Sequence, residues 1–380
     1  MSNALIITSV ASMVDQFLLP STYLLQDMGY NVTVACNFEK GSTCSVEKVA
    51  ELKKILEAHN IKYVQVDFER NATQIIKNRV AYKQLLHILS EQKFDLIHCH
   101  SPVGGMLGRL AARKARKNGA QVLYTAHGFH FYKGAPLKNW LMYYPVEKFC
   151  SRFTDKLITI NKEDYELTKS KFKSGRLYYV PGVGINVSKF ADAQVDIVSK
   201  RDEIGVPVDA LMLTSVGELS KRKNHVVILR ALTQIRDKNI HYVIVGKGAL
   251  LDELQLFVDE NGLSTQVHFL GYRKDIAEIY KASDVCCLPS IHEGLPVALM
   301  EAMASALPCV ASRIRGNIDL IDENGGFLVD TFDVDGYAKA ILQLRNDADM
   351  RKSMGQENRK NAEQYSLDAI VENMKSIYER

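Results

Sequence analysis

Short apolar runs alternate with longer segments of mixed polarity along the whole of this 380-residue chain. Such runs predict buried strands, and the segments between them have the spacing of helices. In the first half, strands are expected at residues 4–9, 31–36, 62–66, 95–99, 121–125, 156–160 and 177–180. In the second half they are expected at 211–217, 241–245, 267–270, 284–288, 308–311 and 327–329. The alternation predicts an α/β fold with doubly wound sheets.

The two sets of strands predict two Rossmann-like domains, because a chain of this length can give each domain its own core. Residues 181–186 lie between the two sets and are rich in turn residues, so this segment is the expected hinge.

The composition narrows the class of protein. A formal net charge of +4 is too small to favour a nucleic-acid binder. No apolar run reaches the roughly 18 residues that cross a bilayer. The apolar stretch 4–14 lacks a basic flank and meets Asp15, unlike a secretion signal. The sequence therefore predicts a cytoplasmic protein.

The cysteines argue against both disulfides and a metal site. All seven, at 36, 44, 99, 150, 286, 287 and 309, are scattered and mostly lie in apolar, strand-like runs, as reduced core cysteines do. The triplet His98, Cys99 and His100 invites a metal interpretation, but alternate residues of a strand face opposite ways and no second cluster of ligands accompanies it. We expect no metal.

Residues 293–301 place two carboxylates around the start of a helix. Glu293 is expected in the loop after the strand 284–288, Glu301 inside the helix, and Pro296 in its first turn. A helix N-terminus favours phosphate or another anion. The backbone N–H groups expected to point out of it belong to Gly294, Leu295, Val297 and Ala298.

Two carboxylates beside an anion site indicate a nucleotide-sugar site, because ionised carboxylates accept paired hydrogen bonds from the hydroxyls of a sugar or ribose. The alternative is a helix-dipole partner at Glu293 and a solvated face at Glu301. Against it, Glu301 interrupts an almost wholly apolar helix at 298–306, where a buried carboxylate needs a partner.

The loop 217–224 carries three adjacent cations, Lys221, Arg222 and Lys223, after the first strand of the second half. Ligands of α/β folds bind at the carboxyl ends of the strands, where these cations can neutralise a diphosphate. A solvated basic turn is the alternative.

His127 follows the strand 121–125 and precedes Gly128, where a neutral imidazole can donate to a sugar hydroxyl or polarise a reacting centre. A lone histidine is more often structural, and nearby His130 has no support beyond its position.

The segment 104–119 carries five cations and no acid, a pattern that attracts an anionic membrane surface. These cations are Arg109, Arg113, Lys114, Arg116 and Lys117. The segment 140–144 adds aromatic residues of the kind found at interfaces. The alternative is an exposed basic helix beside an aromatic core cluster.

Residues 282–312 resemble the signature of the retaining glycosyltransferases of family 4, which have the two-domain GT-B fold. The hallmark is two glutamates with seven residues between them, in a segment that begins Glu-Gly-Leu-Pro, as at 293–301. The similarity continues at 125–128, 216–224, 243–248 and 269–273. Residues 127–147 and 157–165 further resemble the bacterial subgroup that builds capsular and extracellular polysaccharides.

The resemblance implies two Rossmann-like domains that face each other across a cleft. Residues 1–183 would bind the acceptor, 184–366 the nucleotide-sugar donor, and a last helix at 367–380 would cross back to the first domain.

The resemblance also implies roles for single residues. Glu293 would hold the donor sugar, Glu301 the ribose and Lys223 the diphosphate, with His127 at the reacting sugar. Further donor contacts would come from Gly217, Arg222, Gly246, Tyr272, Arg273, Gly294, Leu295, Pro296 and Val297. Gly316 and Asn317 could lie near the diphosphate or form an ordinary turn.

Two departures from the family are visible. Relatives usually have an arginine directly after Gly217, where this chain has Glu218, so Arg222 or Lys221 would have to supply the second phosphate cation. The opening loop, residues 8–17, lacks the usual paired glycines. Asp15 and Phe17 lie there as candidates for contact with the acceptor.

The resemblance therefore predicts transfer of a sugar from a nucleotide diphosphate, UDP above others, to a hydroxyl of a lipid-linked oligosaccharide, with retention. No cofactor, metal or nucleic acid is expected, and the enzyme would work peripherally on the inner face of the cell membrane. A hydrolysing sugar epimerase on the same fold, a glycosidase with two carboxylates and a catalytically silent nucleotide-sugar-binding scaffold remain alternatives.

Overall fold

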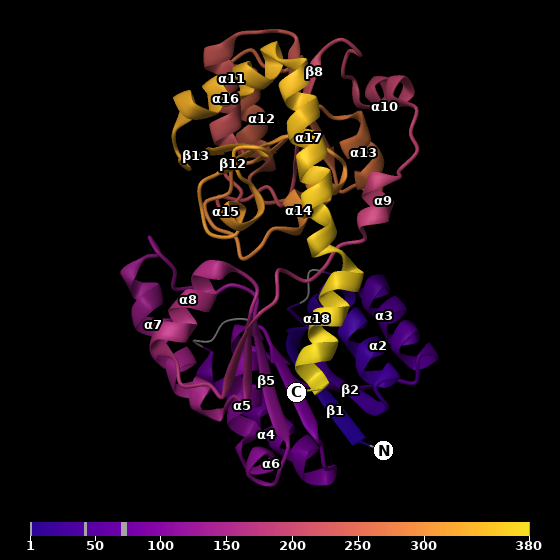
Figure 1. Ribbon diagram of the computed structural model, residues 1–380, viewed down its shortest axis with the longest axis vertical. Coiled ribbons are helices and arrows are strands. Elements are labelled where there is room, and N and C mark those ends of the chain that lie inside the picture. Colours follow the sequence, from indigo (N-terminus) through magenta and orange to yellow (C-terminus); the bar gives the residue numbers. More distant parts are fainter. Residues whose placement is uncertain (1, 42–43, 70–73, 380) are drawn as a thin grey trace. The chain divides into compact units, whose positions relative to one another are not determined.

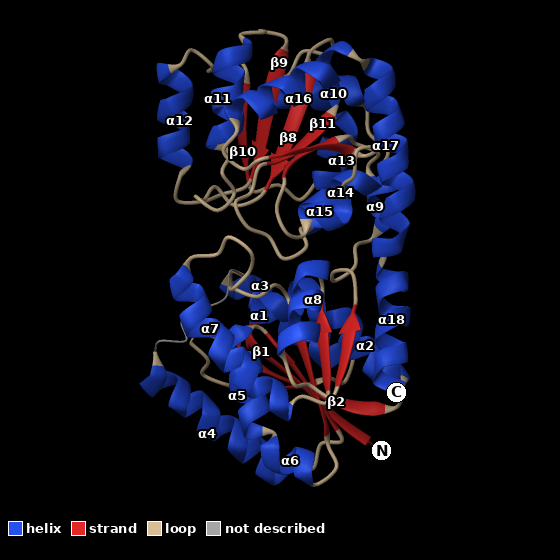
Figure 2. Ribbon diagram, turned by 60° about the vertical axis from the view of Figure 1, so that its left-hand side comes forward, coloured by secondary structure: helices blue, strands red, loops and turns tan. Residues whose placement is uncertain are grey.

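The computed structural model describes residues 2–41, 44–69 and 74–379, and the chain divides into two compact units. Unit 1 comprises residues 1–183 and 370–380, and unit 2 comprises residues 184–369. The boundary after Val183 falls inside the segment 181–186 that was expected to be the hinge. Figures 1 and 2 show that each unit contains one sheet with helices on both of its faces.

Unit 1 is built on a parallel seven-stranded sheet with the order β3-β2-β1-β4-β5-β6-β7. Its strands are β1 (Ser2–Val10), β2 (Tyr30–Asn37), β3 (Lys62–Gln65), β4 (Leu96–His100), β5 (Gln121–Ala126), β6 (Lys156–Thr159) and β7 (Arg176–Tyr179). Helices precede or follow them as α1 (Ala11–Met13), the π-helical turn η1 (Val14–Leu18), α2 (Leu19–Asp27), α3 (Val46–Ala58), α4 (Ile75–Glu91), α5 (Pro102–Ala111), α6 (Arg113–Lys117), α7 (Leu137–Cys150), η2 (Ser151–Phe153) and α8 (Lys162–Lys171).

Unit 2 is built on a parallel six-stranded sheet with the order β10-β9-β8-β11-β12-β13. Its strands are β8 (Leu211–Val216), β9 (Ile240–Val245), β10 (Val267–Gly271), β11 (Val285–Leu288), β12 (Cys309–Ser312) and β13 (Gly326–Val329). Its helices are α9 (Val187–Ala191), α10 (Ile197–Ile204), α11 (Val226–Ile235), α12 (Leu251–Glu260), α13 (Ile276–Ala282), α14 (Val297–Ala304), α15 (Asn317–Leu320), α16 (Val334–Asn346), α17 (Ala348–Ala362) and the turn η3 (Glu363–Tyr365).

All thirteen strands expected from the sequence are present, and each differs from its expected range by one or two residues at most. The apolar runs were reliable because the central strands are covered on both faces, so nearly every position is buried. In β1, for example, every residue from Ala4 to Val10 is buried. Each unit has its own apolar core around its sheet.

The last helix, α18 (Leu367–Glu379), carries the chain from unit 2 into unit 1. Within unit 1, the Tyr378 hydroxyl lies 2.9 Å from Nδ1 of His98, and Lys156 Nζ donates to the carbonyl of Ile377 at 2.7 Å. These contacts tie the end of the chain to β4 and β6. Among the described helices, none is long and apolar enough to cross a membrane.

The basic segment 104–119 is not one exposed helix, contrary to the prediction. It forms α5 and the short α6, and Arg109 on α5 is fully buried. Arg109 Nη2 donates to Glu147 Oε2 at 2.6 Å, and its guanidinium lies 3.8 Å from the centroid of the Tyr124 ring. The local pattern could not reveal this pairing, because Glu147 comes from α7.

Three of the five cations remain exposed, and Arg116 pairs with Asp155 at 2.8 Å. The exposed ones are Arg113, Lys114 and Lys117, all on α6.

Candidate functional site

The strand order of unit 2 reverses between β8 and β11, which is where open α/β sheets bind ligands. The loops that follow these two strands meet there. The carbonyl of Arg222, after β8, accepts a hydrogen bond from the N–H of Ile291, after β11, at 2.7 Å. This backbone contact brings the loop 217–224, which we name the cation loop, beside the segment that holds Glu293.

Glu293 lies at the centre of an ionic cluster that it forms with Lys223 and Arg222. Its Oε1 accepts hydrogen bonds from Lys223 Nζ at 2.7 Å and from Arg222 Nη1 at 2.9 Å. Burial alone would raise the pKa of Glu293, but the charges of Lys223 and Arg222 outweigh it and hold the pKa below its usual range. Glu293 is therefore an ionised carboxylate at neutral pH, and it pairs with two of the cations that the sequence analysis assigned to a diphosphate.

The glycines at this point pack against the cation loop. A Cβ at Gly217 would lie 2.9 Å from Cε of Lys223, so a larger residue there would displace the end of that side chain. Gly246 has a φ of +152°, and a Cβ there would lie 1.9 Å from the Gly217 carbonyl oxygen. The sequence analysis counted Gly246 among the donor contacts. In the structure, a side chain at Gly246 would clash with Gly217, so glycine is needed where the loops after β8 and β9 contact each other.

The helix α14 begins at Val297, so Glu293 lies in the preceding loop as expected, whereas Pro296 is not in the first turn. Pro296 is the residue that precedes its first turn and has an extended backbone, and no side chain caps this N-terminus. Leu295 and Pro296 are buried, whereas Gly294 and Val297 are partly exposed. The N-terminus of α14 thus lies next to the ionic cluster, and no side chain caps its terminal N–H groups.

Arg315, which the sequence analysis did not select, also lies at this cluster. It follows β12, the neighbour of β11, and is only 4% exposed. Its Nε donates to the carbonyl of Glu293 at 3.2 Å, and Nη2 lies 2.7 Å from Nε2 of His292. The signal that could have found Arg315 is its place at the carboxyl end of the next strand along the sheet.

The residues after Arg315 pack beneath the segment 293–295. Gly316 has a φ of +83°, and a Cβ there would lie 2.4 Å from the carbonyl oxygen of Gly294. Asn317 is buried, and its Nδ2 donates to the carbonyl of Ser312 at 2.9 Å. Both residues hold the loop in place, which is the ordinary-turn alternative of the sequence analysis.

Glu301 lies on α14 and is partly exposed. Burial raises its pKa to about 7, against the opposing charge of Lys189. Its carboxylate forms no hydrogen bond with the described residues, so the structure does not join it to the cluster around Glu293. A partly buried carboxylate without a protein donor is available to hydroxyls of a ligand.

Glu218, at the position where relatives have arginine, is exposed. Lys221 is exposed as well, whereas Arg222 contacts Glu293. Of the two substitutes proposed for the missing cation, Arg222 is the one that the structure brings to the carboxylate.

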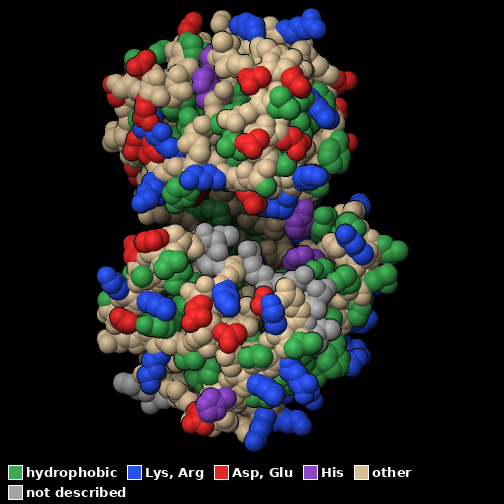
Figure 3. Space-filling view, turned by 180° about the vertical axis from the view of Figure 1, so that it is seen from behind, with side chains coloured by type: hydrophobic (Ala, Val, Ile, Leu, Met, Phe, Trp, Pro, Cys, Tyr) green, Lys and Arg blue, Asp and Glu red, His purple; other side chains and the backbone are tan. Residues whose placement is uncertain are grey.

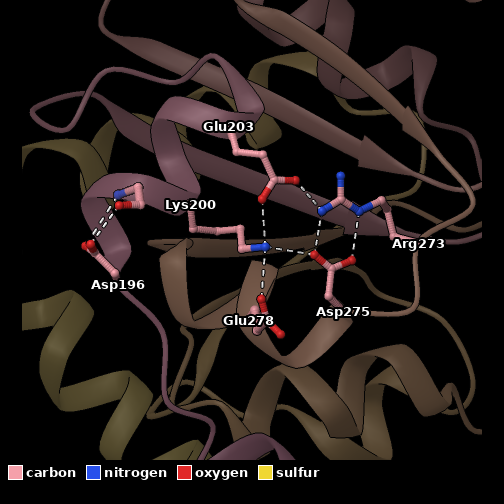
Figure 4. A network of polar contacts seen from close by, with 7 residues as sticks. Asp196, Lys200, Glu203, Arg273, Asp275 and Glu278 are labelled. Carbon is pink, nitrogen blue, oxygen red and sulfur yellow. Dashed lines mark hydrogen bonds and ion pairs between the residues drawn. The ribbon is translucent and has the colours of Figure 1, made fainter.

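Tyr272 and Arg273 follow β10; Tyr272 is exposed and Arg273 is partly exposed. Figure 4 shows Arg273 within a network of ion pairs, where it contacts Asp275 and Glu203 at 2.5 Å each. Lys200 joins the same network from α10, at 2.8 Å from Glu203 and 2.9 Å from Asp275. The charge of Arg273 is therefore taken up by protein carboxylates, while the Tyr272 ring is 69% exposed.

In unit 1, His127 follows β5 and lies beside His100 at the end of β4. Nε2 of His127 is 3.1 Å from Nδ1 of His100. Burial lowers the pKa of His127 to about 4, so the imidazole is neutral at physiological pH, as the sequence analysis assumed. His130 has a different environment, since its ring stacks on Tyr143 at 4.6 Å between centroids.

The two acceptor candidates lie in the π-helical turn η1 after β1. Asp15 forms an ion pair with Lys48 at 3.5 Å, and Phe17 packs against the core of unit 1. A π-helical turn at this position is often found at functional sites. Neither contact identifies a ligand.

No group of three or more histidine, cysteine or acidic side chains suited to a metal ion occurs in the part of the chain that the structure describes. The cysteines described there are all free thiols.

Two family models match the chain. That of the group 1 glycosyl transferases covers residues 196–361, and that of the glycosyl transferase 4-like proteins covers residues 16–161. Among curated proteins, EpsD of Bacillus subtilis, which is named as a glycosyltransferase, is 37% identical over 367 residues, or 95% of this chain and 92% of EpsD. An Escherichia coli UDP-Gal:α-D-GlcNAc-diphosphoundecaprenol α-1,3-galactosyltransferase is 34% identical over 280 residues, or 72% of each chain.

Among solved structures, that of Anabaena HepE in complex with UDP matches with a TM-score of 0.80 at 18% identity, over the whole of both chains. Two Rossmann-like units of this kind define the GT-B fold, and the predicted fold class is confirmed. The chain belongs to the family 4, or group 1, glycosyltransferases. It is a glycosyltransferase, which decides against the glycosidase and the sugar epimerase that two carboxylates alone left open.

Proposed function

We propose that the protein transfers a sugar from a UDP-sugar to a hydroxyl of a lipid-linked oligosaccharide, with retention of configuration, in the synthesis of a capsular or extracellular polysaccharide. The observation that carries the proposal is the cluster of Glu293, Lys223 and Arg222 beside the N-terminus of α14. It combines a cationic loop for a diphosphate with a carboxylate for sugar hydroxyls.

The proposed chemistry needs no nucleophile from the protein. The bond from the sugar's anomeric carbon to the diphosphate breaks, a bond to the acceptor oxygen forms on the same face, and a phosphate oxygen takes the acceptor's proton. Lys223, Arg222 and the end of α14 would stabilise the charge that develops on the diphosphate, and such preorganised stabilisation is usually the largest catalytic effect. Glu293 would orient the donor sugar and His127 would donate to it.

The remaining donor contacts follow from the same placement. Glu301 would accept hydrogen bonds from the ribose, and Tyr272 would flank the base. Arg273 would hold the loop of Tyr272 through its ion pairs with Glu203 and Asp275. Gly217 and Gly246 would act by fixing the cation loop, and residues 294–297 by presenting the helix N-terminus.

UDP is favoured because HepE was crystallised with it and because the E. coli relative is named for UDP-Gal. The same name supports an acceptor linked to diphosphoundecaprenol, and the similarity to EpsD supports polysaccharide synthesis. In this proposal unit 1 binds the acceptor, with Asp15 and Phe17 as candidates for contact, and unit 2 binds the donor.

A lipid-linked acceptor also accounts for an exposed surface of unit 1, which we name the α6–α7 surface. Large apolar side chains are exposed along α7, at Leu137, Leu141, Met142, Val146 and Phe149. The expected interface aromatics, Trp140, Tyr143 and Tyr144, instead pack against the core. Figure 3 shows hydrophobic side chains and a group of lysines and arginines exposed on the same face of unit 1.

The charge of the α6–α7 surface is positive. Lys138 and Lys148 on α7 are exposed, as are Arg113, Lys114 and Lys117 on α6, and the one acid of α7, Glu147, is buried against Arg109. Exposed apolar side chains together with exposed cations fit the surface of an anionic membrane.

The experiment that tests the proposal is a panel of UDP- and GDP-sugars, scored by thermal stabilisation and by slow hydrolysis, followed by transfer to a lipid-linked disaccharide. A bound donor raises the apparent stability by mass action. We expect one UDP-sugar to stabilise the protein and an oligosaccharide product to form. Glu293→Gln should keep donor binding and lose turnover.

Other outcomes contradict the proposal in distinguishable ways. Binding of a UDP-sugar without turnover on any acceptor would make the protein a nucleotide-sugar-binding scaffold, with Glu218 as the lesion. Preference for GDP-sugars would overturn the choice of nucleotide only.

A further inference from the structure

Three histidines lie together at the carboxyl ends of β4 and β5 in unit 1. The rings of His98 and His100 are 4.1 Å apart between centroids, and those of His100 and His127 are 5.4 Å apart. His98 and His100 are buried, whereas His127 is partly exposed. His127 is therefore the member of the trio that can reach a ligand, and the other two can act only through it.

Burial keeps all three imidazoles neutral. It lowers the pKa of His98 to about 3 and that of His127 to about 4, and it lowers the pKa of His100 well below its usual value. A neutral imidazole carries one N–H and one bare nitrogen. The contact between His100 Nδ1 and His127 Nε2 is thus a single N–H···N hydrogen bond, in which one ring donates and the other accepts.

The surroundings of His100 decide which ring donates. Nε2 of His100 is buried and has no hydrogen-bond partner among the described residues. If Nε2 of His100 carried the proton, its buried N–H would be left unpaired. If Nδ1 carries the proton instead, Nε2 has only an unpaired acceptor lone pair. Unpaired buried donors are rarer in proteins than unpaired acceptors. His100 therefore carries its proton on Nδ1 and donates to Nε2 of His127.

The tautomer of His127 follows from this bond. Because Nε2 accepts from His100, neutral His127 must carry its proton on Nδ1. No hydrogen bond to Nδ1 of His127 comes from the residues that the structure describes. The Nδ1–H donor is therefore available to a ligand.

His98 is the natural control within the trio. Its Nδ1 lies 2.9 Å from the Tyr378 hydroxyl and its Nε2 lies 2.8 Å from Oγ1 of Thr125, so both nitrogens are occupied by other partners. His98 is as buried as His100, but it has no hydrogen bond to His127. Its role is to hold α18 and β5 to β4.

We propose that His100 is a positioning residue that fixes His127 in the Nδ1–H tautomer, so that His127 donates a hydrogen bond from Nδ1 to a hydroxyl of the donor sugar. The ligand contact rests on the proposed function, whereas the tautomer rests only on the histidine cluster. The two parts can therefore fail separately.

The first experiment measures the tautomer. Long-range ¹H–¹⁵N spectra of the full-length protein, labelled with ¹⁵N-histidine, distinguish protonated from bare ring nitrogens, and the loss of signals in His127→Gln assigns that residue. We expect protonated Nδ1 and bare Nε2 at His127 in the wild type. In His100→Leu the preference for Nδ1–H should be lost. A wild-type His127 with its proton on Nε2 overturns the inference, whatever the enzyme does.

The second experiment measures turnover with the UDP-sugar found in the donor panel. His100→Leu should lower kcat by about 10²-fold, as when one preorganised hydrogen-bond donor is lost, with little change in donor KM. In His100→Asn the side-chain amide can take the place of the Nδ1–H, so kcat should recover most of the loss. His98→Leu should lower thermal stability and leave kcat near the wild-type value.

The outcomes separate the inference from the proposed function. If His100→Asn were as slow as His100→Leu, or if His98→Leu lost as much turnover, His100 would be only a structural residue. If His127→Ala kept full activity while the spectra still showed Nδ1–H, the proposed contact with donor sugar would fail and the tautomer would stand.

Discussion

The two sheets carry different chemistry at the carboxyl ends of their strands. In unit 2 the loops after β8 and β11 bring a carboxylate, Glu293, between two cations, and burial strengthens the pairing. In unit 1 the ends of β4 and β5 bring together imidazoles that burial keeps neutral. The same architecture thus presents charge in one unit and an uncharged hydrogen-bond donor in the other.

Under the proposed function, this difference would suit the two parts of a nucleotide-sugar donor. A diphosphate carries full negative charges, and fixed cations with a helix N-terminus stabilise it without reorganisation. A sugar ring offers neutral hydroxyls, for which a desolvated imidazole is a suitable donor or acceptor. The comparison predicts that variants of the unit 2 cluster affect charge stabilisation and nucleotide affinity, whereas variants of His127 and His100 in unit 1 affect turnover alone.

The largest effect is expected from Lys223→Ala. Lys223 is buried and contacts Glu293, so its loss removes the best-placed cation for the diphosphate. We expect kcat to fall by about 10²- to 10³-fold, the usual loss when one preorganised donor is removed from a transition state. Steady-state kinetics with a UDP-sugar measure the change.

Lys221→Ala is the matched control, since Lys221 lies in the same loop and is exposed. It should keep near wild-type kcat. Equal losses in the two variants would mean that the loop acts through its overall charge, and an unchanged Lys223→Ala enzyme would remove Lys223 from the mechanism.

A smaller effect is expected from Glu301→Gln. A neutral amide loses charge-assisted hydrogen bonding to the ribose that is worth about 1.5 to 3 kcal/mol in total. The dissociation constant of a UDP-sugar should therefore rise roughly 10- to 150-fold. Isothermal titration calorimetry gives this value directly. Wild-type affinity in the variant would place the ribose elsewhere.

The pH dependence of Glu301 sharpens the same test. Burial raises its pKa to about 7, so the folded protein keeps this proton at pH values where the unfolded chain, with an ordinary pKa of 4.5, has lost it. Stability from this group should fall as the pH rises from about 4.5 to about 7, because the folded state binds more protons across that window. Affinity for a UDP-sugar should rise as Glu301 ionises near pH 7, and Glu301→Gln should show neither trend.

The sequence predicted the fold better than the site, for physical reasons. Strands buried on both faces are continuous apolar runs, so β1, β8 and β11 could be located from composition alone. Glu293, Lys223 and Arg222 could be selected because each lies in the loop that follows such a strand. Their pairing through one oxygen atom depends on how two loops meet, which no local pattern contains.

Contacts that join distant segments were the ones missed. Arg109 was assigned to the surface because its partner Glu147 lies on another helix. Arg315 was overlooked because its neighbours Glu293 and His292 follow a different strand. The interaction of His100 with His127 likewise joins the ends of β4 and β5, and the sequence showed only two separate histidines.

Unit 1 also carries exposed cations, among them those of the α6–α7 surface. If the α6–α7 surface docks on anionic lipid, each cation near the membrane contributes about 1 kcal/mol. Binding to anionic liposomes should exceed that to neutral ones and should fall as salt rises, because screening limits the range to about 8 Å at physiological ionic strength. Changing Arg113, Lys114 and Lys117 to serine should release the protein in a co-sedimentation assay.

A matched control removes three exposed cations from other parts of unit 1, namely Lys54, Lys62 and Lys83. That variant should sediment like the wild type. The α6 variant should still act on a short water-soluble acceptor. Equal binding to neutral and anionic vesicles, or equal loss in both triple variants, would leave α6 as a solvated face.

Removing divalent ions should have no effect on turnover, which makes this the smallest of the expected effects. In unit 2 the positive charge at the site comes from Lys223, Arg222 and the end of α14, and in unit 1 the imidazoles are engaged with one another or with hydroxyls. The described residues offer no cluster of three metal-ligating side chains. Turnover of a UDP-sugar should therefore be the same with and without EDTA. If EDTA abolished turnover and magnesium or manganese restored it, the diphosphate charge would be carried by a metal ion, and the cations of unit 2 would serve chiefly to hold Glu293.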